Sequence, residues 1–166
     1  MFPTSINRRL VLALFALLPA LPALSLAAEQ PAASHRVEAE MLDGTPFSLA
    51  GRDGITLVSV WSPESLASRK CIWELQRFAA AYASRGVYTL AASVPIDRNA
   101  LREFVAKRQL DLPIAILGQH DLGPLDETRL PLVYVFDRQG QLRAAHAGLY
   151  AMRVLERLVA PLLEPQ

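Results

Sequence analysis

One continuous stretch, residues 56–75 (TLVSVWSPESLASRKCIWEL), constrains this chain more than any other. Its first six residues are mostly β-branched, aliphatic and aromatic, which favours a buried strand. Residues 62–64 end that strand, and Ser65 follows at a position suited to a helix N-cap. Apolar side chains then recur at helical spacing at Cys71, Leu75, Phe78 and Tyr82. The stretch therefore predicts a strand, a short loop and the N-terminus of a long helix, a junction with free N–H groups and a positive dipole end.

The same stretch resembles the TlpA/ResA-like thioredoxin-fold (redoxin) family, whose members are periplasmic or membrane-tethered thiol–disulfide oxidoreductases. In that family a hydrophobic strand and a Trp lead through a few residues into Cys-x-x-Cys and a basic pair. Trp61 and the pair Arg69-Lys70 match without a gap, but the two cysteine positions fall on Ser65 and Ser68. The resemblance therefore implies the fold and argues against the chemistry, because disulfide exchange needs a thiolate and a second sulfur.

Two further positions bear on this resemblance. Residues 130–137 resemble the family's Pro-Thr-Thr-Phe-Leu-Ile-Asp strand, and Pro131 matches the proline that is cis and lies against Cys-x-x-Cys. The alternative is a trans proline that opens an edge strand. Thioredoxins and many relatives also have a buried Asp six residues before the first Cys, where this chain has Ser59. We interpret Ser59 as a small buried residue bonded to backbone, so a second part of the redox machinery is absent.

The fold that this resemblance implies is thioredoxin-like α/β, with a central mixed β-sheet, helices on both faces and an N-terminal β-hairpin. The residues agree with it. Asp43-Gly44 is a turn signal within a hairpin at residues 35–49, and Asp97 is suited to cap a helix that runs to about Arg108. We predict the other elements at residues 87–94 (strand), 112–116 (short extended piece), 130–137 with 141–147 (hairpin) and beyond Gly148 (final helix). Residues 118–129 are predicted to be a loop that faces the active-site end.

The start of the chain has the form of a secretory signal peptide. Arg8 and Arg9 precede an apolar run, and Ser25-Leu26-Ala27 supplies small residues for cleavage before Ala28. We therefore predict a signal peptide at residues 1–27, a short tether at 28–35 and a periplasmic thioredoxin-like domain at 36–166. The alternative is an uncleaved anchor in the inner membrane over residues 10–28, which carry no charge.

Charge and metal-ligating residues exclude several kinds of function. The chain has 17 basic and 16 acidic residues, and loss of Arg8 and Arg9 with the signal leaves 17 − 2 = 15 basic residues, so nucleic acid is not expected as a partner. A single cysteine excludes an internal disulfide and a cysteine-based zinc cluster. Three histidines share no ligand spacing: His35, His120 and His146. We expect no metal and no cofactor.

The single cysteine, Cys71, allows two interpretations. It lies on the apolar stripe of the helix, which indicates a small core residue. The alternative is a thiol-dependent oxidoreductase or peroxidase acting through Cys71, with Ser68 and Arg129 as its helpers. Ser68 has the spacing of a peroxiredoxin loop, but Pro63 misses the motif by one position and Arg129 misses the position of Pro131 by two.

We predict a non-catalytic protein that keeps the fold and binds a partner. The partner would be a periplasmic protein or peptide, another redox protein included, and an extended segment of it would lie in the groove beside the degenerate motif. The predicted groove residues are Trp61, Ser65, Leu66, Ala67, Ser68, Leu130 and Pro131.

Overall fold

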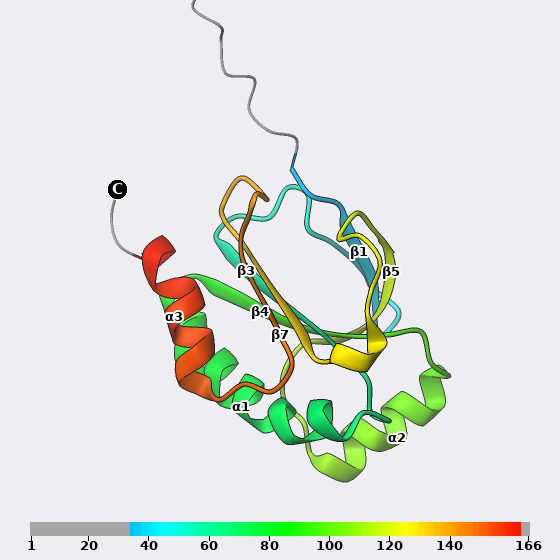
Figure 1. Cartoon of the computed structure of the whole chain (residues 1–166). Coiled ribbons are helices and arrows are strands. Elements are labelled where there is room, and N and C mark those ends of the chain that lie inside the picture. Colours follow the sequence, from blue (N-terminus) through cyan, green and yellow to red (C-terminus); the bar gives the residue numbers. More distant parts are fainter. Residues whose placement is uncertain (1–33, 164–166) are drawn as a thin grey trace, which may run out of the picture. The chain divides into compact units, whose positions relative to one another are not determined.

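The computed structural model describes residues 34–163 (Figure 1). The predicted signal peptide, the tether up to residue 33 and the last three residues of the predicted domain lie outside the described residues. Within residues 34–163, no helix is both long enough and apolar enough to cross a membrane. The elements are β1 (Val37–Met41), β2 (Pro46–Ser48), β3 (Ile55–Trp61), α1 (Leu66–Tyr82), η1 (Ala83–Arg85), β4 (Val87–Ser93), α2 (Arg98–Arg108), β5 (Ile114–His120), η2 (Glu127–Arg129), β6 (Leu132–Phe136), β7 (Leu142–Ala147) and α3 (Met152–Leu163).

The strands form one seven-stranded mixed sheet in the order β2-β1-β5-β4-β3-β6-β7. β3 pairs in parallel with β4 and antiparallel with β6, and β4 pairs in parallel with β5. β1 and β2 form the predicted N-terminal hairpin, and β6 and β7 form the predicted second one. The predicted mixed sheet and both hairpins are therefore confirmed.

The strand β3 is buried along its whole length because the sheet has a hydrophobic core on each face. Ile55, Leu57 and Trp61 belong to one core, whereas Val58 and Val60 belong to the other. Such burial on both faces explains why β3 reads as an almost continuous apolar run rather than as an alternating pattern.

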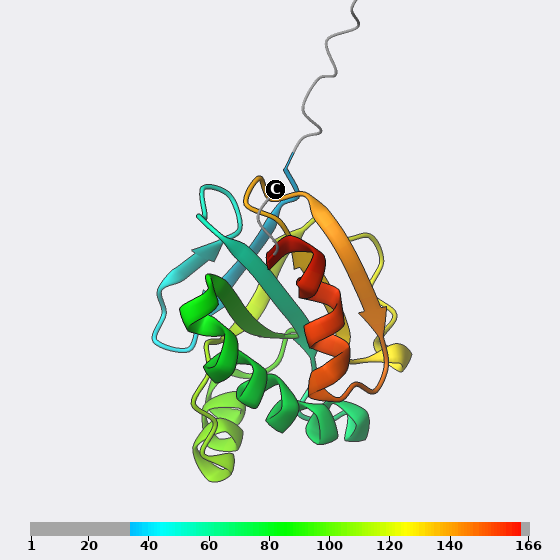
Figure 2. The same ribbon diagram turned by 90° about the vertical axis from the view of Figure 1, so that its left-hand side faces the viewer.

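All three α-helices pack on one face of the sheet (Figure 1). Their most deeply buried apolar side chains share a single core with Trp61: Cys71 and Leu75 from α1, Leu101 from α2, and Leu155 and Val159 from α3. Figure 2 shows α3 beside α1 on this side. The helices α1 and α2 lie together because the connections β3-α1-β4 and β4-α2-β5 step across the sheet in the same direction, and such connections are right-handed. The predicted placement of helices on both faces is thus corrected.

The opposite face is covered by strands and loops among the described residues. Phe47 and Leu49 of the N-terminal hairpin region pack there, together with Leu122, Leu125 and Leu130 from the segment before β6. The structure differs from the predicted loop at residues 118–129 in two places. β5 runs on to His120 because β1 lies beside it as a partner, and Val37 pairs with His120. Only the single turn η2 interrupts the remaining loop.

Candidate functional site

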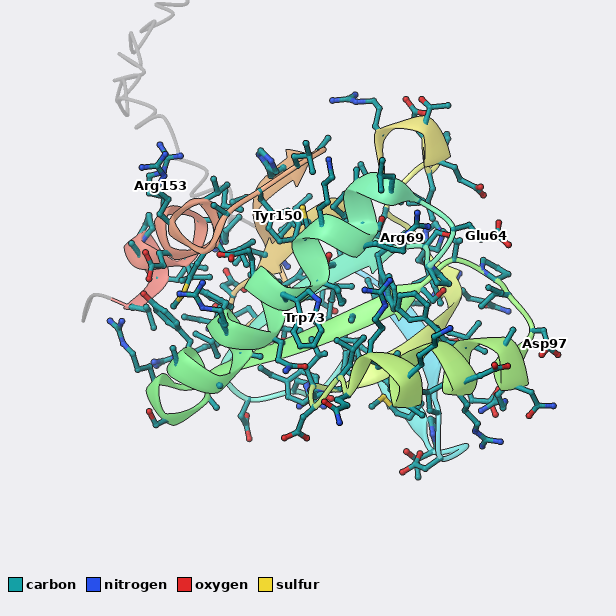
Figure 3. All side chains as sticks on the ribbon, turned by 90° about the horizontal axis from the view of Figure 1, so that it is seen from below. Glu64, Arg69, Trp73, Asp97, Tyr150 and Arg153 are labelled. Atoms are coloured by element: carbon teal, nitrogen blue, oxygen red, sulfur yellow. The ribbon has the colours of Figure 1, made fainter. Side chains whose placement is uncertain are left out.

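The junction between β3 and α1 has the predicted form. Ser65 is the N-cap of α1, and its Oγ accepts a hydrogen bond from the Ser68 backbone N–H at 3.3 Å. Ser68 is buried, and its Oγ accepts from the Ser62 backbone N–H at 3.3 Å. The Arg69 guanidinium donates to the carbonyl oxygens of residues 63 and 64 at 2.9 and 3.0 Å, and Figure 3 shows Arg69 near Glu64. Both serine hydroxyls therefore hold the local backbone, which is the usual role of such residues at a helix start.

The start of β6 lies beside this junction. Val60 of β3 pairs with Leu132 of β6, so Pro131 lies beside the C-terminal end of β3. The Leu130–Pro131 peptide bond is cis, as the resemblance implied. The Pro131 carbonyl oxygen accepts a hydrogen bond from the Gly148 N–H at 2.9 Å. This hydrogen bond therefore holds the loop before α3 against the start of β6, beside the junction.

Two of the four large apolar side chains that are exposed in the described chain lie at this end of the molecule. Leu66, in the first turn of α1, is 61% exposed, and Leu149, next to Gly148, is 60% exposed. We give the name junction surface to the accessible residues at this end of the molecule, which are Ser65, Leu66, Ala67 and Leu149.

Four of the predicted groove residues are buried: Trp61, Ser68, Leu130 and Pro131. Trp61 is only 1% exposed, because alternation along β3 places it on the helix side, where its ring lies 5.7 Å from that of Phe104. It can support the junction surface from below but offers almost no surface to a ligand. The accessible part of the predicted groove is therefore Ser65, Leu66 and Ala67.

A buried polar cluster lies beneath the junction surface and involves a residue that the sequence did not single out, Tyr150. Its hydroxyl lies 3.1 Å from the Ser59 Oγ, so Ser59 is buried as predicted but bonds a side chain rather than backbone. The Tyr150 N–H donates to the Cys71 Sγ at 3.2 Å, and this thiol donates to the Tyr150 carbonyl oxygen at 3.5 Å. Figure 3 shows Tyr150 just before α3, on the side toward α1. The requirement that a buried serine find a partner was the signal for such a residue.

The thiol of Cys71 lies in the helix-side core and is 1% exposed, so its predicted place in the core is confirmed. Burial raises the pKa of the Cys71 thiol, outweighing the hydrogen bond from Tyr150, and the nearby Glu74 carboxylate raises it further. The two residues that would assist the Cys71 thiol in the alternative enzyme make no hydrogen bond to it in the described part of the chain. The Ser68 hydroxyl accepts a hydrogen bond from the Ser62 N–H, and Arg129 is exposed in η2. This environment disfavours the thiolate on which the alternative thiol enzyme would depend.

The histidines make separate contacts. The His35 Nδ1 lies 3.0 Å from an oxygen of Asp121, and the His146 Nε2 lies 3.1 Å from the Leu149 carbonyl oxygen. Within residues 34–163, no three His, Cys, Asp or Glu side chains are grouped so as to hold a metal ion.

Comparison with solved structures decides the fold. The domain superposes with a TM-score of 0.67 on a thiol:disulfide interchange protein of the thioredoxin family from Chlorobium tepidum TLS, with 18% identity over 83% of this chain and all (100%) of the other. The chain has a thioredoxin-like fold. A secreted thiol-disulfide isomerase from Corynebacterium glutamicum gives the same TM-score of 0.67, with 19% identity over 78% of this chain and 84% of the other. The predicted thioredoxin-like α/β fold is therefore confirmed.

The thioredoxin-like chain also has a characterised relative in sequence. It is 28% identical over 110 residues to the thiol-disulfide oxidoreductase YkuV of Bacillus subtilis (strain 168), a match that spans 63% of this chain and 74% of YkuV. No family model matches the chain. These similarities confirm the predicted resemblance to TlpA/ResA-like, thiol–disulfide oxidoreductase-like proteins.

Proposed function

We propose that this thioredoxin-like chain is a non-catalytic relative of the thiol–disulfide oxidoreductases that binds an extended segment of a partner protein at the junction surface. One observation carries the proposal: the single cysteine, Cys71, is buried in the core, while serines occupy positions 65 and 68 at the start of α1. A dithiol mechanism needs two sulfur atoms, one of them an accessible thiolate. This chain supplies neither the second sulfur nor the accessibility.

The junction surface supports the binding part of the proposal. Leu66 and Leu149 are exposed, and the backbone next to each is held in place, by the Ser65 cap at the start of α1 and by the hydrogen bond from Gly148 to Pro131. Exposed apolar side chains on a rigid frame suit recognition of an extended peptide, because little ordering of the protein is needed on binding. The partner would be a protein or peptide, another redox protein included.

Site-specific photocrosslinking in the native host tests this proposal. A photoreactive residue placed at Leu66 or at Leu149 should capture the same partner, since both belong to the junction surface. The matched control is Leu142, which is also an exposed large apolar residue, 37% exposed, but lies on β7. Equal capture from Leu142 and Leu66, or no adduct from either junction position, would argue against a binding site at the junction.

We further propose that the protein is exported to the periplasm and that the mature chain begins near Ala28. The charged start, the apolar run and the small residues before Ala28 support this, and one similar structure is that of a secreted protein. N-terminal sequencing of periplasmic material should find a start near Ala28. An intact start in the membrane fraction would indicate the anchor over residues 10–28 instead.

A further inference from the structure

A second exposed feature begins at Leu66 of the junction surface and continues along α1. Leu66, Lys70, Trp73 and Arg77 follow one another at intervals of three or four residues, so they share one face of the helix, which we call the α1 stripe. Lys70 and Arg77 are exposed, and Trp73 is 41% exposed. Two of the four exposed large apolar side chains of the described residues thus lie on this one helix face. Trp and Arg are the residue types enriched at the energetic centres of protein interfaces.

The α1 stripe contains two positively charged residues, Lys70 and Arg77, and the single acidic residue of this helix, Glu74, lies beside it. Glu74 accepts a hydrogen bond from the Met152 N–H of α3 at 2.9 Å through one carboxylate oxygen. The other oxygen lies 3.2 Å from Arg77, an exposed pair whose mutual attraction is weak. Lys70 makes no ion pair or hydrogen bond with any residue in the described part of the chain.

The end of α2 lies beside α1 and carries charges of both signs. The Asp111 N–H donates to the Gln76 side chain at 2.7 Å, which holds the chain after α2 against α1. The last turn of α2 contains Lys107 and Arg108. Figure 3 shows Trp73 projecting from α1 on the side where α2 lies. Asp111 is exposed and acidic, so we assign the positive charge beside Trp73 to Lys70 and Arg77, about one turn before and one turn after it on α1. An aromatic side chain between two cations is complementary to a segment that combines carboxylates with apolar residues.

We propose that the α1 stripe binds an acidic segment of the partner protein that also carries apolar or aromatic residues, in continuation of the contacts at the junction surface. The inference rests on the proposed function, because Leu66 belongs to both surfaces and one partner would cross them. A symmetric contact between the stripes of two copies of this chain is disfavoured, since it would bring positive charges together.

Binding of a synthetic copolymer of glutamate and tyrosine tests the chemistry directly. The chain has two tryptophans, and Trp61 is buried, so a change in fluorescence on binding would report on Trp73. We expect saturable binding that weakens with added salt, and no binding of polylysine. Lys70→Gln should weaken binding about tenfold, equivalent to about 1.4 kcal/mol. Trp73→Ala, followed by anisotropy of a labelled copolymer, should weaken it similarly.

The matched control is Arg153→Gln, which removes one exposed positive charge from α3; Figure 3 shows Arg153 well apart from Trp73. It should leave the affinity for the copolymer unchanged. Equal weakening by Lys70→Gln and Arg153→Gln, or no saturable binding, would overturn the inference. Binding of phosphatidylglycerol vesicles in place of the copolymer would also overturn it, by assigning the stripe to a membrane. A dimer that Trp73→Ala abolishes would do the same by assigning the stripe to a second copy.

The proposed binding at the junction surface and the proposed binding at the α1 stripe can be tested separately. Leu149→Asp alters the junction surface and leaves the α1 stripe intact, so it should not affect copolymer binding. If photocrosslinking finds no partner at Leu149 while copolymer binding still depends on Lys70, the proposed function fails and the stripe stands. If crosslinking succeeds but Lys70→Gln is silent, the stripe is overturned and the junction site stands.

Discussion

The hydroxyl oxygens of Ser59 and Tyr150 lie 3.1 Å apart and both side chains are buried, although 91 residues separate them in the chain. Ser59 lies within β3, and Tyr150 precedes α3, so this contact ties the interior of the sheet to the start of the last helix. Cys71 and Glu74 of α1 also hold the start of α3, because they accept hydrogen bonds from the N–H groups of Tyr150 and Met152.

Removal of the Tyr150 hydroxyl should therefore lower the free energy of unfolding. Tyr150→Phe leaves the buried Ser59 hydroxyl without this partner, which should cost about 1–3 kcal/mol in urea denaturation. Ser59→Ala combined with Tyr150→Phe should lose less than the sum of the single changes, because the two groups act as a pair. Additive losses would mean that the hydroxyl contact contributes little.

Stability should also fall at alkaline pH. Burial raises the pKa of Tyr150 in the folded protein, against a smaller opposing effect of the Ser59 hydroxyl. The unfolded chain therefore releases this proton first, at about pH 10, so the stabilisation is fully present below that pH and is lost as pH rises further. Urea denaturation at several pH values should give a flatter alkaline decline for Tyr150→Phe. An unchanged slope would show that Tyr150 does not titrate differently in the two states.

The thiol of Cys71 should react slowly with a disulfide reagent in the folded protein and rapidly in denaturant. Cys71→Ala should lower the free energy of unfolding by about 1–3 kcal/mol, because it leaves a small cavity and an unpaired Tyr150 N–H. Cys71→Ser, which keeps a donor and an acceptor, is the matched control and should cost less. Equal labelling rates with and without denaturant would instead favour the thiol-dependent alternative, with Ser68 and Arg129 as helpers.

The purified protein should not reduce the disulfides of insulin. Ser65→Cys combined with Ser68→Cys should create a chain that can form a disulfide at the start of α1, because the helix N-terminus that favours a thiolate is already present. Its activity should stay weak, since a serine stands at position 59 where thioredoxins have a carboxylate. Insulin reduction by the unmodified chain that disappears in Cys71→Ala would contradict the non-catalytic proposal.

Elements with local signals could be predicted from the sequence. The apolar run of β3, the Ser65 and Asp97 caps and the turn at Asp43-Gly44 act within a few residues, and the structure has all of them. Pro131 could be predicted to be cis only through the family resemblance.

Features that depend on distant partners could not be predicted. The extension of β5 to His120 follows from pairing with β1, which no local pattern in β5 reveals. The burial of Trp61 depends on Phe104 from α2, and the bond of Ser59 depends on Tyr150. At the candidate site the sequence therefore indicated Ser65, Leu66 and Ala67 but missed Leu149 and the support beneath them.

The position of β1 between β2 and β5 has a consequence for the order in which the chain can fold. A polypeptide emerges from the ribosome with its N-terminus first, and domains complete their structure only when the last essential partner is available. The hairpin of β1 and β2 can pair within itself early, but its place in the sheet exists only after β5 has been made. Until then β1 presents an open edge, so this end of the sheet can close only once residues 114–120 are available to pair, at the ribosome or after export.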